Sequence, residues 1–223
     1  MSRKVKISKD KLHDLCIEVA HEYIEESHDS NAMFRASISA SVLSRLEKKL
    51  SKYMEDNKMK TVAKFKRVSY EQFIKDSALN DCAIAQSIYK DIKIPVRSTK
   101  GSAGYDFFAP REIVIQPHSE ILIPTGIKCK IRKGYVLNLY PRSGLGFKHG
   151  LRLLNTVGII DSDYYNNADN EGHIKVKMYN PTDRVVIIEE NTAFVQGIFT
   201  KFYLAEEEEV TEERKGGFGS TTK

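Results

Sequence analysis

A pair of carboxylates, Asp161 and Asp163, follows a short apolar segment in GIIDSDYY, and two tyrosines come directly after it. If an extended backbone continues through both residues, the two carboxylates point to the same side. One could then act as a general base while the other organises its surroundings. A D-x-D segment taken alone is more often a solvated loop, so other residues must decide between the two interpretations.

Two further segments offer groups that bind phosphate or a metal. The segment PRSG places the guanidinium of Arg142 beside the hydroxyl of Ser143 and the amide of Gly144. That combination suits phosphate oxygens, although Pro, Ser and Gly are also common in plain β-turns. The segment GSAGYDFFAP adds a third carboxylate, Asp106, among small residues that permit close approach of the backbone.

The segment GGFGST, residues 216–221, follows an acidic run near the end of the sequence. Its amides and hydroxyls could grip phosphates and Phe218 could stack on a base, whereas a glycine-rich tail is otherwise merely flexible. Four polar, glycine-rich stretches, which we interpret as loops, thus offer carboxylates, phosphate-binding groups and a stacking ring: residues 101–110, 141–150, 155–166 and 214–221.

The elements that must position these stretches change character near Ile92. Before it, residues 9–28 and 32–56 carry apolar side chains at steps of three and four, which predicts a hairpin of two amphipathic helices. Beyond it, short segments rich in Ile, Val, Leu and Tyr alternate with Pro and Gly. This pattern predicts an all-β barrel or sandwich without helices.

A short helix is predicted between these two regions. Ser69 and Gln72 have the spacing of a capping box. The helix that begins there is expected to end near Asp76 or Ala78.

Composition excludes several classes of function. The chain of 223 residues has a net charge of +5 without a cluster of basic residues, which argues against nucleic-acid binding. No apolar run approaches the roughly 20 residues of a membrane helix, and no secretory signal is evident, so we expect a cytoplasmic protein without a membrane partner. The three cysteines have neither disulfide nor zinc spacing, and we expect them to be small buried hydrophobic residues.

The order of the motifs resembles that of the trimeric dUTPases. The motifs are SAGYDFFA, PRSGLGFKHG, NTVGIIDSDYYN, AFVQGIF and GGFGST. The resemblance implies a jelly-roll-like β-barrel, Mg2+ dependence, and a homotrimer whose active sites are shared between subunits. It implies hydrolysis of dUTP to dUMP and pyrophosphate.

Within the third motif, the resemblance assigns the chemistry and the recognition of the nucleoside. Asp161 matches the general base that activates the water attacking the α-phosphorus. Asn155 matches the position whose amide reads uracil, and Gly158 lies in the same substrate-binding segment. Tyr164 matches the tyrosine that packs under the deoxyribose and excludes a 2'-hydroxyl.

In the first, second and fourth motifs, the resemblance assigns the triphosphate contacts. Arg142, Ser143 and Gly144 match phosphate binders, and Gln196 matches a further phosphate contact. Asp106 matches the acid that orders the water shell of Mg2+, which is held mainly by the substrate phosphates.

In the fifth motif, Phe218 matches the ring that stacks over uracil. Arg214, Gly219, Ser220 and Thr221 match the part that grips the phosphates.

Three departures from the family pattern stand out. Gly146 replaces the usual alanine of the second motif, and Ala193 stands where the fourth motif often has arginine. After Tyr164 the family commonly continues Arg-Gly, whereas YNNADNEGHI follows here, with an insertion over residues 165–172.

We expect a helical hairpin at residues 1–60, which is also a candidate surface for a protein partner, and a strand and helix lead-in at 61–91. The β core then covers 92–205, and residues 206–223 form an acidic spacer and an arm that closes the active site. Two other interpretations remain: a dCTP deaminase-type enzyme of the same fold, and a regulatory or binding protein on this scaffold.

Overall fold

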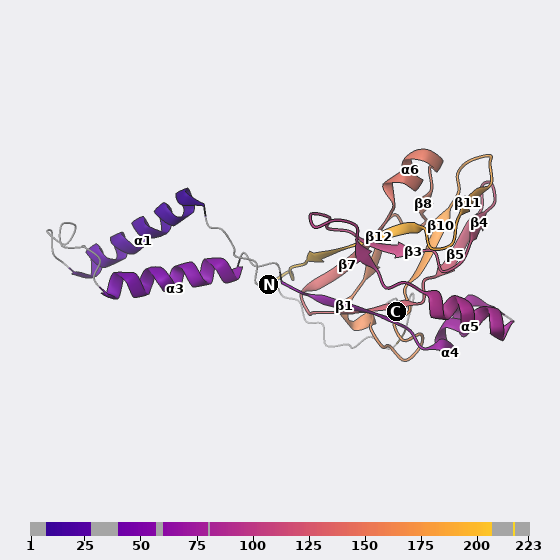
Figure 1. Cartoon of the computed structure of the whole chain (residues 1–223), viewed down its shortest axis with the longest axis horizontal. Coiled ribbons are helices and arrows are strands. Elements are labelled where there is room, and N and C mark those ends of the chain that lie inside the picture. Colours follow the sequence, from indigo (N-terminus) through magenta and orange to yellow (C-terminus); the bar gives the residue numbers. More distant parts are fainter. Residues whose placement is uncertain (1–7, 28–39, 57–59, 80, 207–215, 217–223) are drawn as a thin grey trace. The chain divides into compact units, whose positions relative to one another are not determined.

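The computed structural model describes residues 8–27, 40–56, 60–79, 81–206 and 216. Contacts within the chain divide it into two compact units, Met1–Thr61 and Val62–Lys223 (Figure 1).

The first unit holds two helices that pack against each other, α1 (Lys9–Ser27) and α3 (Ala40–Asp56) (Figure 1). Leu15 and Val19, one turn apart on α1, are buried, as expected for the apolar stripe of an amphipathic helix. The first predicted helix is confirmed. The end of the second is confirmed too, while its predicted start at Ala32 lies outside the described residues.

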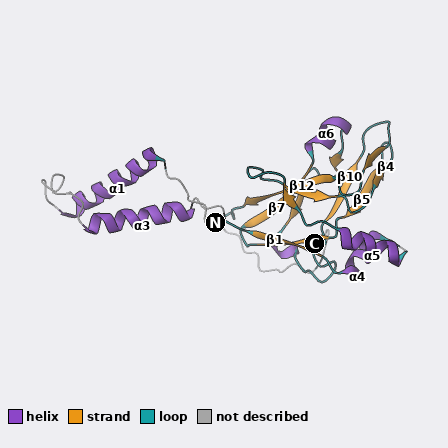
Figure 2. Ribbon diagram, in the orientation of Figure 1, coloured by secondary structure: helices purple, strands orange, loops and turns teal. Residues whose placement is uncertain are grey.

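The second unit consists mainly of antiparallel strands (Figure 2). They are β1 (Ala63–Arg67), β2 (Val96–Arg97), β3 (Tyr105–Phe108), β4 (Ile113–Ile115), β5 (Glu120–Pro124), β6 (Ile127–Ile131), β7 (Tyr135–Pro141), β8 (Arg152–Leu153), β9 (Gly158–Ile160), β10 (Lys175–Tyr179), β11 (Val186–Ile188) and β12 (Ala193–Lys201). The main sheet has five strands in the order β2-β3-β12-β7-β9, and smaller sheets pair β5-β10-β8, β11-β4 and β1-β6. The predicted mainly β fold is confirmed.

Alternation along the strands directs one face of each into the core. On β6, Ile127, Cys129 and Ile131 are buried while the lysines between them are not. Of the rings that we expected in the core, Phe107 and Phe194 are fully buried; Phe108 and Phe199 are half-buried.

The cysteine prediction is confirmed only for Cys129. Cys16 and Cys82 are exposed, because Cys16 lies on the solvent side of α1 and Cys82 begins a surface helix.

Two helices precede the main sheet. The first, α4 (Tyr70–Ser77), begins where predicted, because the hydroxyl of Ser69 accepts a hydrogen bond from the amide of Gln72 at 3.1 Å. The second, α5 (Cys82–Asp91), was not predicted. Its start is capped by Asp81, whose carboxylate accepts two amide hydrogen bonds from the first turn.

The prediction that the β region contains no helix is wrong. Residues of PRSGLGFKHG form α6 (Ser143–His149), and a 3-10 turn, η1 (Ser162–Tyr164), follows β9. Gly150 ends α6 with a φ of 63°, a left-handed conformation that glycine adopts without strain. Asp106 also lies on a strand, β3, instead of a loop, because its aromatic neighbours suit a half-buried strand.

Candidate active site

Adjacent strands of the main sheet carry residues from four of the sequence motifs. Asp106 on β3 lies opposite Gln196 on β12, and Gln196 lies opposite Tyr140 on β7. On the far side of β7, Leu139 lies opposite Gly158 on β9. Since paired strands lie about 4.8 Å apart, the register brings the first, second and fourth motifs together and sets the third beside them.

Asp106 and Arg142 form an ion pair at the centre of this group. Nη1 of Arg142 lies 2.6 Å from Oδ1 of Asp106, and the hydroxyl of Ser98 donates to Oδ2 at 2.5 Å. Asp106 is 5% exposed, whereas the side chain of Arg142 is 37% exposed. The pair uses one of the five guanidinium donors, so Arg142 is aimed by Asp106 and still presents a positive charge to solvent. The role of Ser98 was not predicted, because a hydroxyl eight positions before the carboxylate belongs to no motif.

The neighbours of Arg142 are arranged for close approach of a ligand. Ser143 and Gly144 form the first turn of α6 and are exposed. Gln196 is half-buried, and a Cβ on Gly104 would lie 2.7 Å from its Oε1. Gly104 therefore leaves room that a larger residue would take from the Gln196 amide.

A separate cavity contains the residues expected to bind the base. It has a volume of about 480 Å³, within the range usual for small-molecule sites. Asn155 and Gly158 line it together with Leu122, Leu139, Leu153, Leu154, Lys175, Val176 and Lys177. A Cβ on Gly158 would approach the Cβ of Leu139 to 3.1 Å, so glycine keeps this strand pair close. Most of the lining is apolar, which suits a flat ring, and its polar side chains are those of Asn155, Lys175 and Lys177.

The two carboxylates of the third motif do not share a strand. β9 ends at Ile160, and Asp161 is the half-buried residue that precedes η1. Asp163 lies within η1 and is exposed. The alternation of side chains that would align the carboxylates therefore stops before Asp163, and the two occupy different environments.

Tyr164 is placed deeper than the sequence indicates. It is 5% exposed and its hydroxyl donates to the main-chain oxygen of His173 at 3.0 Å. The amide of Asn170 donates to the same hydroxyl at 2.9 Å. The sequence reasoning missed these partners, which lie in the segment where the chain departs from the family pattern.

The residues present fit a metal ion that is held mainly by the substrate. Within the described ranges, no three His, Cys, Asp or Glu side chains are grouped to hold a metal. Each carboxylate oxygen of Asp106 accepts one hydrogen bond, which leaves further lone pairs for a water molecule. Asp106 can thus order a water of an Mg2+ ion without being its direct ligand.

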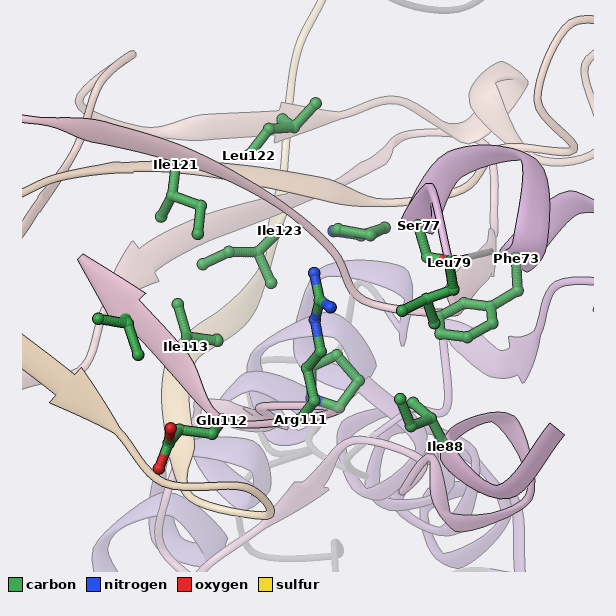
Figure 3. A pocket seen from close by; sticks show the side chains of 13 residues that line it. Phe73, Ser77, Leu79, Ile88, Arg111, Glu112, Ile113, Ile121, Leu122 and Ile123 are labelled. Carbon is green, nitrogen blue, oxygen red and sulfur yellow. The ribbon is translucent and has the colours of Figure 1, made fainter. Parts of the chain in front are cut away.

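Figure 3 shows a second, smaller cavity of about 210 Å³ under α4 and α5. Phe73, Leu79, Ile88 and Ile123 contribute to its apolar wall, and Arg111 projects among them. None of the predicted site residues lines it, so it lies apart from the candidate active site.

The fifth motif lies almost wholly outside the described residues, which include only Gly216 of this segment. The predictions for the following residues are therefore not tested: Arg214, Phe218, Gly219, Ser220 and Thr221. Among the helices that the structure describes, none has the length and apolar character needed to span a membrane.

Comparison with known proteins gives consistent matches. The dUTPase family model matches residues 90–222. A deoxyuridine 5'-triphosphate nucleotidohydrolase from Lactococcus lactis subsp. lactis is 51% identical over 132 residues, covering 58% of this chain and 88% of that protein. Its counterpart from Nautilia profundicola is 38% identical over 62% of this chain and 96% of its own length. The crystal structure of dUTPase from Streptococcus mutans matches with 37% identity and a TM-score of 0.51, covering 64% of this chain and 98% of that one.

Proposed function

The chain belongs to the dUTPase family and hydrolyses dUTP, and we propose that it forms dUMP and pyrophosphate through attack of water on the α-phosphorus. The observation that carries this mechanism is the strand register that sets Asp106 opposite Gln196 beside the Asp106–Arg142 pair. Phosphoryl substitution needs alignment and neutralisation of charge more than covalent help from the protein. A group that combines a fixed guanidinium with an amide meets that need.

Asp161 is the general base in this proposal. It stands at the end of β9, three residues after Gly158 of the base cavity. A carboxylate there can take a proton from the attacking water while the base and sugar are held nearby. Asp163, the exposed residue of η1, is assigned no proton transfer in this proposal.

The triphosphate binds to the second and fourth motifs. Arg142, Ser143, Gly144 and Gln196 contact its oxygens, and Asp106 keeps Arg142 aimed through the 2.6 Å ion pair. Mg2+, when bound, supplies further neutralisation of the phosphate charge, with Asp106 ordering one of its waters.

The nucleoside lies in the cavity beside the third motif. Asn155 reads the edge of uracil, and Gly158 lines the same cavity. The ring of Tyr164 forms the wall beside C2' of the deoxyribose and excludes ribonucleotides.

The fifth motif completes the site as a closing arm. Phe218 covers uracil, while Arg214, Gly219, Ser220 and Thr221 grip the phosphates and exclude water. We infer a homotrimer in which the arm and the motifs of different subunits form each site. A nucleoside triphosphate substrate favours a location in the cytoplasm.

Turnover tests the proposal directly. Purified protein with dUTP and Mg2+ should release pyrophosphate and dUMP, and omission of Mg2+ should slow the reaction. With dCTP it should release neither dUMP nor ammonia; release of ammonia would favour a deaminase of the same fold. Absence of turnover on either nucleotide would favour a binding protein on this scaffold.

A further inference from the structure

The segment after Tyr164, residues 165–173, is held by buried side-chain amides. Asn167 and Asn170 are 8% and 4% exposed. Asn167 donates from Nδ2 to the main-chain oxygen of Tyr164 and to Oδ1 of Asn170, both at 2.8 Å. Asn170 donates from Nδ2 to the Tyr164 hydroxyl at 2.9 Å, and its Oδ1 accepts from the amide of Gly172 at 3.0 Å. Tyr164 is therefore held at its main chain and at the far end of its ring.

The second partner of the Tyr164 hydroxyl is anchored from helix α4. That hydroxyl donates to the main-chain oxygen of His173, whose side chain is 0% exposed. Nε2 of His173 accepts from the amide of Gly126 at 2.7 Å, and Nδ1 lies 2.6 Å from Oδ2 of Asp76. Because an amide N–H only donates, Nε2 carries no proton and Nδ1 donates to Asp76. The ring is thus fixed on both sides.

Asp76 connects α4 with two parts of the nucleoside region. Its Oδ1 accepts from Nζ of Lys175 at 2.5 Å, and Lys175 lines the cavity that also contains Asn155. Its Oδ2 contacts His173, which supports Tyr164. A helix that precedes the family motifs in the sequence therefore braces both the base cavity and the sugar wall.

We propose that Asn170 is a positioning residue that, together with the Asp76-anchored His173, sets selectivity for dUTP over UTP by holding Tyr164 rigid. The inference rests on the role proposed above for Tyr164 as the wall beside C2'. An apolar pocket rejects an isostere with one extra hydroxyl only by about 100-fold. A ring that is hydrogen-bonded at its far end cannot retreat to make room, so the rejection of UTP becomes stronger.

The test compares kcat/KM for dUTP and UTP in two variants that release the ring in different ways. Asn170→Ala removes the donor, and Tyr164→Phe keeps the ring but removes the hydroxyl. In Asn170→Ala, which removes one hydrogen bond to the hydroxyl, the dUTP to UTP ratio should fall by about tenfold, mainly through faster UTP turnover. Tyr164→Phe removes both hydrogen bonds of the hydroxyl, so its ratio should fall at least as far. The ratio of the double variant should fall no further than that of Tyr164→Phe, because Tyr164→Phe already removes the hydroxyl to which Asn170 donates.

Asn180→Ala is the matched control. Asn180 is also a fully buried amide, with hydrogen bonds to the main-chain oxygens of Ile115 at 3.1 Å and Arg184 at 2.8 Å. This variant should lower the melting temperature and leave the dUTP to UTP ratio unchanged. A ratio that falls as much as in Asn170→Ala would mean general loosening of the fold and would overturn the inference.

Tyr164→Ala separates this inference from the proposed function. If Tyr164→Ala lowers the ratio but neither Asn170→Ala nor Tyr164→Phe does, the positioning role is wrong while the sugar wall stands. If Tyr164→Ala leaves the ratio at the value of the unmodified protein, the sugar wall itself is wrong and the inference fails with it. Pyrophosphate release from dUTP by the unmodified protein tests the activity independently of both.

Discussion

The proposed phosphate side of the site and the proposed sugar wall at Tyr164 are held in place by different means. Asp106 and Gln196 stand on paired strands, so their positions follow from main-chain register. Tyr164 stands in η1, the turn that follows β9, and is held by the side chains of Asn167 and Asn170. A strand register depends on many main-chain hydrogen bonds, whereas the position of Tyr164 depends on a few hydrogen bonds from side chains. Substitutions on the first side should therefore change rate and binding, and those on the second side should change selectivity.

The largest effect is expected from the proposed general base, Asp161. Asp161→Asn should lower kcat by about 100- to 10,000-fold, the usual contribution of a general base, with nucleotide binding nearly intact. Asp163→Asn, at an exposed position two residues away, is the control and should lose less than about tenfold. Steady-state pyrophosphate release and nucleotide titration measure both quantities. Equal losses in the two variants would remove Asp161 from the base role.

The next largest effect should come from the proposed C-terminal arm, which is part of neither the phosphate side nor the wall at Tyr164. Deleting residues 216–223 removes Phe218, Ser220 and Thr221, so turnover should fall by about 100-fold or more through lost alignment. Removing only Thr222 and Lys223 is the control. Light scattering should give the same number of subunits for all three proteins, and full activity without the arm would contradict its closing role.

A smaller effect is expected from the ion pair of the phosphate side. Asp106→Ala leaves Arg142 without its anchor, so KM for dUTP should rise by about tenfold, the scale of one charge-assisted hydrogen bond. Because Arg142 is 37% exposed and can turn to solvent, the loss in unfolding free energy should stay below about 3 kcal/mol.

The control for this variant is Asp183→Ala. Asp183 pairs with His118 on the surface and its side chain is 96% exposed, so its loss should change neither KM nor stability by a measurable amount. An unchanged KM in Asp106→Ala would mean that Arg142 does not depend on Asp106.

The sequence identifies the residues of the phosphate side better than the contacts that hold Tyr164, and the reason is physical. Asp106, Arg142 and Gln196 belong to motifs that the sequence shows, so the residues themselves could be identified. The sequence nevertheless indicates a loop over residues 101–110, and the pairing of β3 with β12 that sets Asp106 opposite Gln196 is seen only in the structure. The position of Tyr164 depends on a hydrogen bond from Asn170 and, through His173, on Asp76 of helix α4, about a hundred residues earlier in the sequence. No local sequence pattern indicates such contacts.

Helix α6 was missed for a related reason. Gly144 and Gly146 have poor helix propensity, and the turn signals of PRSG indicate a loop. The helix forms nevertheless, because the main-chain oxygen of Arg142 accepts the first amide hydrogen bonds and Gly150 ends the helix in a left-handed conformation.

The smallest predicted effect is a pH dependence of folding stability that comes from Glu171, in the segment after Tyr164. Burial would raise the pKa of Glu171, but hydrogen bonds from Lys128 and Ser69 outweigh it and lower the pKa to about 2 from 4.5. A carboxylate whose folded pKa is depressed stabilises the protein above its unfolded pKa. That contribution is therefore fully present above about pH 4.5 and is lost as the pH falls toward 2.

Glu171→Gln tests this dependence by denaturant unfolding between pH 7 and pH 3. The variant should be less stable than the unmodified protein at pH 7, and the difference should shrink below about pH 4.5. Glu189→Gln, at an exposed position, should show no such change. A difference that stays constant with pH would show that the charge of Glu171 is not what stabilises the loop.

His173 should add a second range of pH, above that of Glu171, in which folding stability changes. Burial lowers the pKa of its ring, and the neighbouring Asp76 offsets this only in part. The folded protein then keeps the ring neutral while the unfolded chain takes up a proton below about pH 6.5, so stability should already begin to fall there. His173→Gln should remove this first decline, and an unchanged profile in that variant would assign it to another group.

The position of bond cleavage tests the central claim most directly. A single turnover of dUTP in water enriched in oxygen-18, followed by mass spectrometry of both products, shows which phosphorus the water attacks. Attack on the α-phosphorus, with Asp161 as the base, predicts the label in dUMP and none in pyrophosphate. Label in pyrophosphate would place the attack on the β-phosphorus and contradict the account.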